Sequence, residues 1–155
     1  MELHIYREGK IDRIVKDQSK ESILYYIEAP YKYFSSPPKL VYRGRPPNAA
    51  QIATINANRQ TCTITLPGLR DVIIDYPGVL HSKSKFNMDG RQFAWKSDQQ
   101  LIEVESGKVL ARFDRTMLAI HKKGVLTIYG DGMGMVDVIV ITAIAMQYQW
   151  EEKRR

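Results

Sequence analysis

MVDVIVITAIAMQYQW, residues 135–150, is the longest apolar run in the chain, and between Met135 and Met146 only Asp137 and Thr142 interrupt it. Its β-branched residues favour a strand. Sixteen residues without glycine or proline nevertheless exceed the usual strand of about 5–6 residues, whereas a helix of this length spans roughly 24 Å. A helix that is apolar on all sides belongs inside a protein. The run therefore predicts a buried C-terminal helix over about 135–150.

The flanks of this run agree with a helix. Gly130, Gly132 and Gly134 form a hinge before it, Asp137 suits a helix N-terminus, and the basic residues 153–155 suit the C-terminal end. About 12 apolar residues interrupted by an aspartate fall short of the ~20 that a membrane span needs. No transmembrane segment is predicted.

Composition bounds the class of protein. A chain of 155 residues with 44% hydrophobic residues is predicted to form a single domain, 1–155, with a sizeable core. A single cysteine, Cys62, excludes an internal disulfide, and the charged start MELHIYREGK lacks the apolar region of a signal peptide. We therefore expect a cytoplasmic protein, either free or peripheral to a membrane.

The net charge of +6 is unevenly distributed along the chain. Residues 1–36 carry six basic and six acidic side chains, residues 37–128 carry fourteen and seven, and residues 129–155 carry three and four. The positive excess lies in the middle segment. A basic surface attracts anionic lipid or nucleic acid, and it also keeps proteins soluble.

Short β-type runs separated by turn residues fill most of the chain, which is typical of an antiparallel all-β domain. Residues 37–155 are predicted to form a barrel plus its central helix, and residues 1–36 an N-terminal extension or the first strand or strands. The predicted strands are Ile23–Glu28, Leu40–Arg43, Gln51–Ile55, Thr61–Leu66, Val72–Asp75, Ser84–Met88, Gln92–Lys96, Leu101–Glu105, Val109–Asp114, Met117–His121 and Val125–Tyr129.

Asp89-Gly90 is the strongest hairpin signal in the chain, because Gly90 can adopt the positive φ that a tight hairpin turn needs. Around it, Phe86 and Met88 alternate with Lys85 and Asn87, so one face of the sheet is apolar. A sheet of this many strands must close or stack to hide its edges. The fold predicted is mainly β: a closed antiparallel barrel around the C-terminal helix.

The second half of the chain resembles a known family. The segments KFNMDGRQFAWK (85–96), LIEVESGKVLARFDR (101–115), GVLTIY (124–129) and DVIVITAIAMQYQWEEKRR (137–155) are similar to the fungal domain of unknown function 6593, DUF6593. That family resembles the tubby C-terminal-like group, which includes the LURP-one-related proteins and the phospholipid scramblases. The resemblance implies a closed barrel threaded by a hydrophobic helix. Fold alone does not establish function.

Tubby-like proteins bind phosphoinositide head groups through barrel lysines and arginines, so the resemblance implies an anionic ligand here. The candidate binding residues around the Asp89-Gly90 hairpin are Lys83, Lys85, Arg91 and Lys96. Opposed strands would bring Lys85 and Lys96 within reach of one phosphate. Alternatively, these lysines simply form the solvent-exposed face of the strands and bind no ligand. Two further basic spots, Arg43 with Arg45 and Lys122 with Lys123, are equally explained by turn chemistry.

An enzyme is the alternative class. Asp137 on the buried helix could act as a general base in the barrel lumen, and His81 is the next catalytic candidate. The three histidines have no metal-binding spacing, and no cofactor motif is recognised. The tyrosines that could stack on nucleic-acid bases lie in the charge-neutral segment 1–36, away from the basic residues, so nucleic acid is not favoured.

We therefore predict a non-enzymatic intracellular module that binds anionic phospholipid or a protein partner at a membrane surface. The alternative is a small enzyme that uses a pocket at the barrel mouth or in the lumen for a hydrophobic metabolite.

Overall fold

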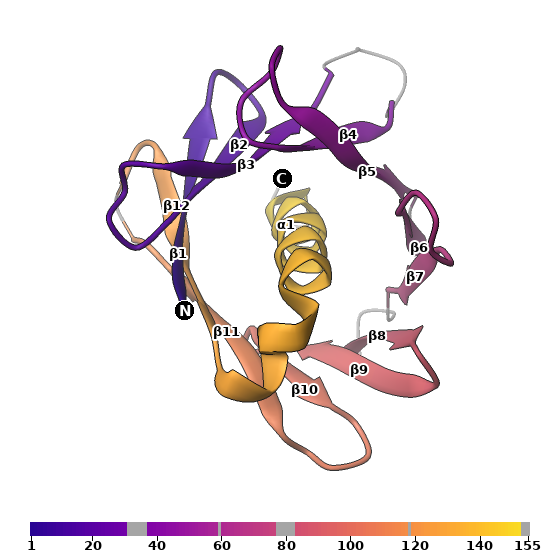
Figure 1. Ribbon diagram of the computed structural model, residues 1–155. Coiled ribbons are helices and arrows are strands. Elements are labelled where there is room, and N and C mark those ends of the chain that lie inside the picture. Colours follow the sequence, from indigo (N-terminus) through magenta and orange to yellow (C-terminus); the bar gives the residue numbers. More distant parts are fainter. Residues whose placement is uncertain (31–36, 59, 77–82, 118, 153–155) are drawn as a thin grey trace.

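The computed structural model describes residues 1–30, 37–58, 60–76, 83–117 and 119–152, and all statements below concern these residues. They form a closed barrel of twelve antiparallel strands around one helix (Figure 1). This is the predicted fold class, and the barrel and its central helix are confirmed. Each strand pairs with its neighbours in sequence, and β1 pairs with β12 to close the ring.

The strands have the following bounds: β1 Glu2–Glu8, β2 Asp12–Lys16, β3 Ile23–Glu28, β4 Lys39–Arg43, β5 Ala50–Ala57, β6 Thr61–Thr65, β7 Val72–Asp75, β8 Lys83–Met88, β9 Arg91–Lys96, β10 Gln100–Glu103, β11 Val109–Arg115 and β12 Lys122–Ile128. A 3₁₀ helix, η1 (Gly130–Met135), leads into the α-helix α1 (Val136–Glu152).

Helix α1 fills the barrel lumen. The ten consecutive residues 138–147 are all buried, so every side of the helix is covered by protein. By length and composition alone the span Gly130–Glu151 could cross a membrane, with a mean hydropathy of 1.3, but 67% of its most apolar window is buried within the protein. The inward faces of the strands supply the cover, which is the arrangement that an all-round apolar helix requires.

Side chains of the barrel wall fix the helix in place. The indole Nε1 of Trp95 donates a buried hydrogen bond of 2.9 Å to Oγ1 of Thr142, the polar residue in the middle of α1. Trp95 also meets the ring of Trp150 edge-on, with 6.4 Å between ring centroids. The Thr142 hydroxyl thus satisfies a buried donor that would otherwise destabilise the core.

The Asp89-Gly90 hairpin joins β8 to β9 as predicted. Both turn residues have positive φ, 52° for Asp89 and 73° for Gly90, which is the signature of the type I′ turn that suits two twisted strands. Phe86 and Phe93 lie opposite each other on the inward face and stack with 5.4 Å between centroids. The predicted alternation is confirmed here.

Two parts of the strand prediction were incomplete or wrong. Of the two alternatives for residues 1–36, an extension or the first strands, the structure shows strands: residues 1–22 contain β1 and β2, so the N-terminal segment is part of the barrel wall. The predicted strand Met117–His121 is not a strand in its described residues, and Lys122-Lys123-Gly124 is no turn but the start of β12. Gly124 reflects close packing, because a β-carbon there would lie 2.4 Å from the Asp114 carbonyl oxygen and 2.6 Å from the Phe113 ring.

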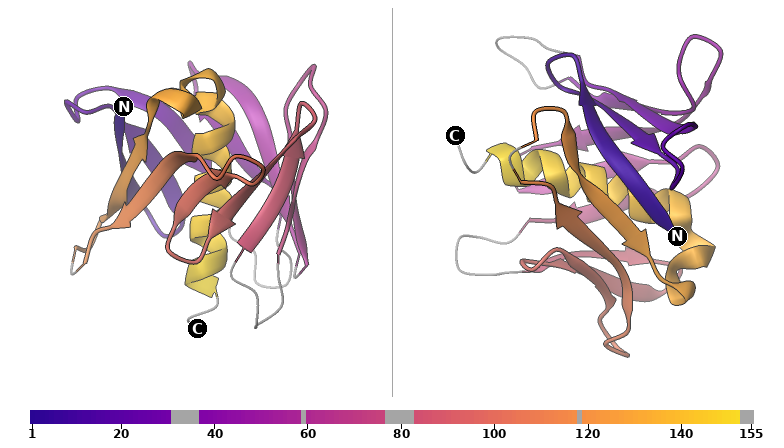
Figure 2. Two further views of the ribbon diagram at one scale, coloured as in Figure 1. Left: turned by 90° about the horizontal axis from the view of Figure 1, so that it is seen from below. Right: turned by 90° about the vertical axis from the view of Figure 1, so that its left-hand side faces the viewer.

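The barrel has two distinct ends (Figure 2). Strand direction alternates around the ring, so the connections alternate between the two ends. We call the end where α1 begins the helix-start rim; it carries η1 and the β6–β7, β8–β9 and β10–β11 turns. We call the other end, where α1 finishes, the helix-end rim; it carries the β9–β10 turn and the β11–β12 loop (residues 116–121).

Candidate functional site

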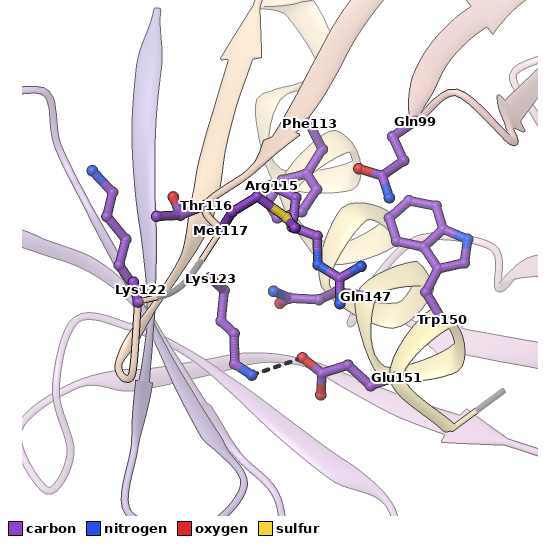
Figure 3. A pocket seen from close by; sticks show the side chains of 11 residues that line it. Gln99, Phe113, Arg115, Thr116, Met117, Lys122, Lys123, Gln147, Trp150 and Glu151 are labelled. Carbon is purple, nitrogen blue, oxygen red and sulfur yellow. Dashed lines mark ion pairs between the residues drawn. The ribbon is translucent and has the colours of Figure 1, made fainter. Parts of the chain in front are cut away.

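A pocket of about 260 Å³ opens at the helix-end rim, between the last turns of α1 and the β11–β12 connection (Figure 3). It is lined by Gln99, Phe113, Arg115, Thr116, Met117, Ala119, Lys122, Lys123, Gln147, Trp150 and Glu151. The lining combines an aromatic wall with several cations. Such a concave mixture of apolar surface and a few polar groups is the usual form of a small ligand site.

The strand register determines where the cationic side chains of the pocket point. Arg115 ends β11 in the inward register of Ala111 and Phe113, and its side chain reaches over the helix near Gln147 (Figure 3). The register of β12 against β1 skips Lys123, which marks a β-bulge, and a bulge redirects a side chain. Lys123 consequently points to Glu151, whereas Lys122 points away from the pocket centre (Figure 3).

The two inward cations differ in their partners. Lys123 Nζ forms an ion pair of 3.0 Å with Glu151. The guanidinium of Arg115, in contrast, makes no hydrogen bond or ion pair with another described residue. Among the described residues, Arg115 is therefore a cation at the pocket without a carboxylate partner.

Behind the pocket, Arg13 of β2 points into the barrel and is almost completely buried, with 2% of its side chain exposed. Its Nη2 forms an ion pair of 2.6 Å with Glu151, its Nε donates to Gln147 over 3.4 Å, and its Nη1 donates to the carbonyl oxygen of Ile11 over 2.9 Å. The guanidinium also lies 4.6 Å from the ring centroid of Tyr148. These contacts hold the helix end against the barrel wall and occupy most of the hydrogen-bond donors of Arg13.

The aromatic wall of the pocket is built by Trp150 and Phe113, whose rings stack with 6.3 Å between centroids. Next to it, the β11–β12 loop exposes two large apolar side chains, Met117 at 74% and Ile120 at 75%. The helix-end rim thus places a cation-bearing pocket beside exposed apolar surface.

The predicted binding lysines lie on the outer wall of the barrel. Lys83 is directly opposite Lys96, and Lys85 is opposite Ala94, so Lys83 rather than Lys85 is the cross-strand partner of Lys96. Lys85 also faces Asp75 of β7, and Lys96 has Asp98 at 3.6 Å. Lys83 and Lys96 lie at the ends of β8 and β9 that meet the helix-end rim.

Arg91 is separated from these lysines. It begins β9 at the helix-start rim, in the register of the inward residues Phe93 and Trp95, and stacks 5.1 Å from the centroid of the Phe93 ring. Its Nε donates to Glu103 over 2.5 Å. The structure therefore brings together three of the four predicted residues and places Arg91 elsewhere, already paired with a carboxylate.

Asp137, the candidate general base, lies at the opposite end from the pocket. Its carboxylate accepts a hydrogen bond from the Tyr25 hydroxyl and forms an ion pair of 2.5 Å with Arg43. Burial alone would raise the pKa of Asp137, but the hydrogen bonds from Arg43 and Tyr25 outweigh it and hold this pKa below its usual value. A carboxylate stabilised in its ionised form is a weak base. The second catalytic candidate, His81, lies outside the described residues.

A second pocket, of about 510 Å³, lies at the helix-start rim between the β6–β7 and β8–β9 turns. It is larger, but its charged lining residues are one arginine, Arg70, and two aspartates, Asp71 and Asp89. Its neighbouring Leu69 is 68% exposed. This end therefore has exposed apolar surface without an excess of positive charge.

Sequence reasoning missed Arg115, Trp150 and the exposed loop residues Met117 and Ile120. It noted Lys122 and Lys123, but as a turn. The signal was present in the order of residue types, since the segment RTMLAIHKK (115–123) places apolar residues between cations. Its apolar residues suggested a strand, because strand and loop cannot be separated by composition over so few residues.

The family model described as "Family of unknown function (DUF6593)" matches residues 10–152 of the chain. The match covers strands β2 to β12 and the helix completely, and only β1 lies outside it. No curated protein and no solved structure matches the chain.

Proposed function

This chain belongs to the DUF6593 family, and because the function of that family is unknown, we propose one from the site: a binding module that recognises anionic phospholipid head groups with its helix-end rim. The fold and the family are compatible with a binding module. What we propose beyond this is the class of ligand, anionic phospholipid head groups.

The observation that carries the proposal is the Arg115 side chain, which reaches into the pocket without a partner among the described residues. The planar guanidinium fork fits the oxygens of a phosphate, and charge-assisted hydrogen bonds of this kind are roughly twice as strong as neutral ones. Lys123 lies on the same pocket and adds positive charge that Glu151 only partly offsets, because Glu151 also pairs with Arg13.

The lysines of the outer wall also favour the helix-end rim as the binding surface. Lys83 and Lys96 stand side by side near the helix-end rim, and the ion pair of Lys96 with Asp98 offsets only one of the two positive charges. They would therefore add long-range attraction to an anionic surface. This attraction is screened over about 8 Å at physiological ionic strength, so binding should weaken as salt is raised.

A vesicle co-sedimentation experiment tests the proposal. Phosphatidylcholine vesicles are compared with vesicles that also contain phosphatidylserine or a phosphoinositide. We expect the protein to bind the anionic vesicles and Arg115→Glu to weaken this binding roughly thirtyfold, since each cation near such a surface contributes about 1 kcal/mol and the reversal changes two charges.

The matched control is Arg70→Glu, which changes the net charge equally at the helix-start rim, where Arg70 is also exposed. The control should bind anionic vesicles almost as well as the unmodified protein. Equal binding to neutral and anionic vesicles, or equal losses in the two variants, would overturn the proposal.

A further inference from the structure

The β11–β12 loop exposes apolar side chains that the fold does not use. Met117 and Ile120 are about three-quarters exposed, and both lie on the connection between two strands that are otherwise buried on their inner face. An exposed apolar residue is not unusual by itself. Two on one short loop, next to a ligand pocket, form a local apolar tip.

Charge complementarity indicates what would cover this tip. Arg115 precedes it and Lys122 and Lys123 follow it, and the segment 115–123 contains no acidic residue. The described part of this segment therefore places exposed apolar side chains between positively charged residues on both sides. An anionic membrane has the matching order, with apolar chains beneath a layer of negative head groups.

We propose that the β11–β12 loop inserts Met117 and Ile120 into the outer part of an anionic bilayer, so that the barrel stands on the membrane on its helix-end rim. This inference rests on the proposed function, because it assigns the partner and the orientation of the same rim. Side chains that insert in this way reach about 5–10 Å into the boundary between head groups and acyl chains.

The orientation has a direct consequence for the pocket. Helix α1 runs along the barrel axis and ends at this rim (Figure 2), so the pocket lined by Arg115, Lys123 and Trp150 would face the head groups. The helix-start rim, with Leu69 and a pocket lined by one arginine and two aspartates, would face away from the membrane.

Two tryptophan variants measure insertion directly. Ile120→Trp and the matched Leu69→Trp each place an indole at an exposed apolar site, one on each rim. Fluorescence is recorded on phosphatidylserine-containing vesicles whose acyl chains carry bromine, a short-range quencher, with the unmodified protein providing the background from Trp95 and Trp150. We expect quenching of the indole in Ile120→Trp and none beyond background in Leu69→Trp.

The double variant Met117→Ser with Ile120→Ser provides an independent readout. Removing two partly inserted apolar side chains should weaken binding to anionic vesicles by roughly tenfold or more, because their apolar surface would no longer be withdrawn from water. Leu69→Ser should have little effect. Melting temperatures of all variants show that the barrel is folded.

The outcomes separate this inference from the proposed function. If anionic vesicles bind and Arg115→Glu weakens binding as expected, but Ile120→Trp is not quenched and the double serine variant binds normally, the head-group proposal stands and insertion is overturned. If the unmodified protein does not prefer anionic vesicles, the proposed function itself fails. Quenching of Leu69→Trp instead of Ile120→Trp would reverse the orientation.

Discussion

The two ends of the central helix are anchored to the barrel by the same pair of groups, an arginine and a carboxylate, in opposite environments. At the helix-end rim Arg13 is 2% exposed and contacts Glu151. At the helix-start rim Arg43 is 54% exposed and contacts Asp137. Water therefore cannot take over the contacts of the buried Arg13 at the helix end, whereas it can take over those of the exposed Arg43 at the helix start.

The rims differ in a second respect. Both expose apolar residues, but those of the β11–β12 loop are flanked by cations, whereas Leu69 is followed by Arg70 and Asp71. Apolar exposure is therefore shared, and the charge around it distinguishes the ends. This difference is the basis for assigning ligand binding to the helix-end rim alone.

The largest effect on stability is expected from the two arginines. Arg13→Leu leaves the buried Gln147 and the carbonyl oxygens of Ile11 and Asp12 without their donor, and it leaves Glu151 with Lys123 alone. Because each buried group left unsatisfied costs about 1–3 kcal/mol, the free energy of unfolding should fall by about 3–5 kcal/mol. Arg43→Leu should cost at most about 1 kcal/mol, because its pair is exposed to solvent. Urea unfolding measures both.

A double variant sharpens this test. Arg13→Leu combined with Glu151→Leu removes both charges and should recover part of the loss, since the partly buried carboxylate of Glu151 no longer has to lie at the barrel wall without Arg13. Lys123 would then lose its ion pair with Glu151, but it can turn to solvent. Equal losses for Arg13→Leu and Arg43→Leu would contradict the contrast between the two anchors.

An intermediate effect is expected at the glycines of η1, at the helix-start rim. A β-carbon on Gly132 would lie 2.7 Å from the Leu110 carbonyl oxygen and 2.9 Å from a methyl group of Ile139, whereas one on Gly134 meets nothing within 4 Å. Gly132→Ala should therefore destabilise by about 1–3 kcal/mol, and Gly134→Ala should be close to neutral. Thermal unfolding of the two variants makes the comparison, and similar melting temperatures would refute the close packing of η1 on β11.

The smallest effect is the pH dependence of the Asp137 pair. The pKa of Asp137 is lower in the folded protein than its ordinary value, so its contribution to stability is present above the unfolded-state pKa and is lost as the pH falls through the folded-state pKa. Asp137→Asn should flatten the fall in stability in acid relative to the unmodified protein. Because the group is partly exposed, we expect only a small change. Parallel pH profiles of the two proteins would show that the pair contributes nothing.

Much of the fold follows from local sequence signals. The length of the 135–150 run required a helix, and Asp89-Gly90 defined a hairpin whose φ values are those of the predicted turn. β1 and β2 were not recognised because arginines stand at inward positions: Arg7 and Arg13 lie opposite each other where alternation would otherwise show apolar residues. From the sequence alone Arg13 would be taken for a surface residue. It is buried because Gln147 and Glu151 of α1, more than a hundred residues further along the chain, contact its side chain.

The site could be predicted only in part, because it depends on contacts between distant segments. The pocket joins β11 and the β11–β12 loop to the end of α1, which lies about thirty residues further along the chain. Strand register also lies beyond local pattern: alternation placed Lys83, Lys85 and Lys96 on one face, but only the register shows that Lys83 is the partner of Lys96. The inward turn of Lys123 follows from a bulge that no residue type announces.

Hydrogen exchange of the full chain on anionic vesicles, with neutral vesicles as the reference, tests the central claim most directly. The account predicts that the backbone amides of residues 115–123 and of the last turn of α1 become protected on anionic vesicles, while those of the β6–β7 and β8–β9 turns do not change. Protection at the β6–β7 and β8–β9 turns, or no difference between the two kinds of vesicle, would contradict it.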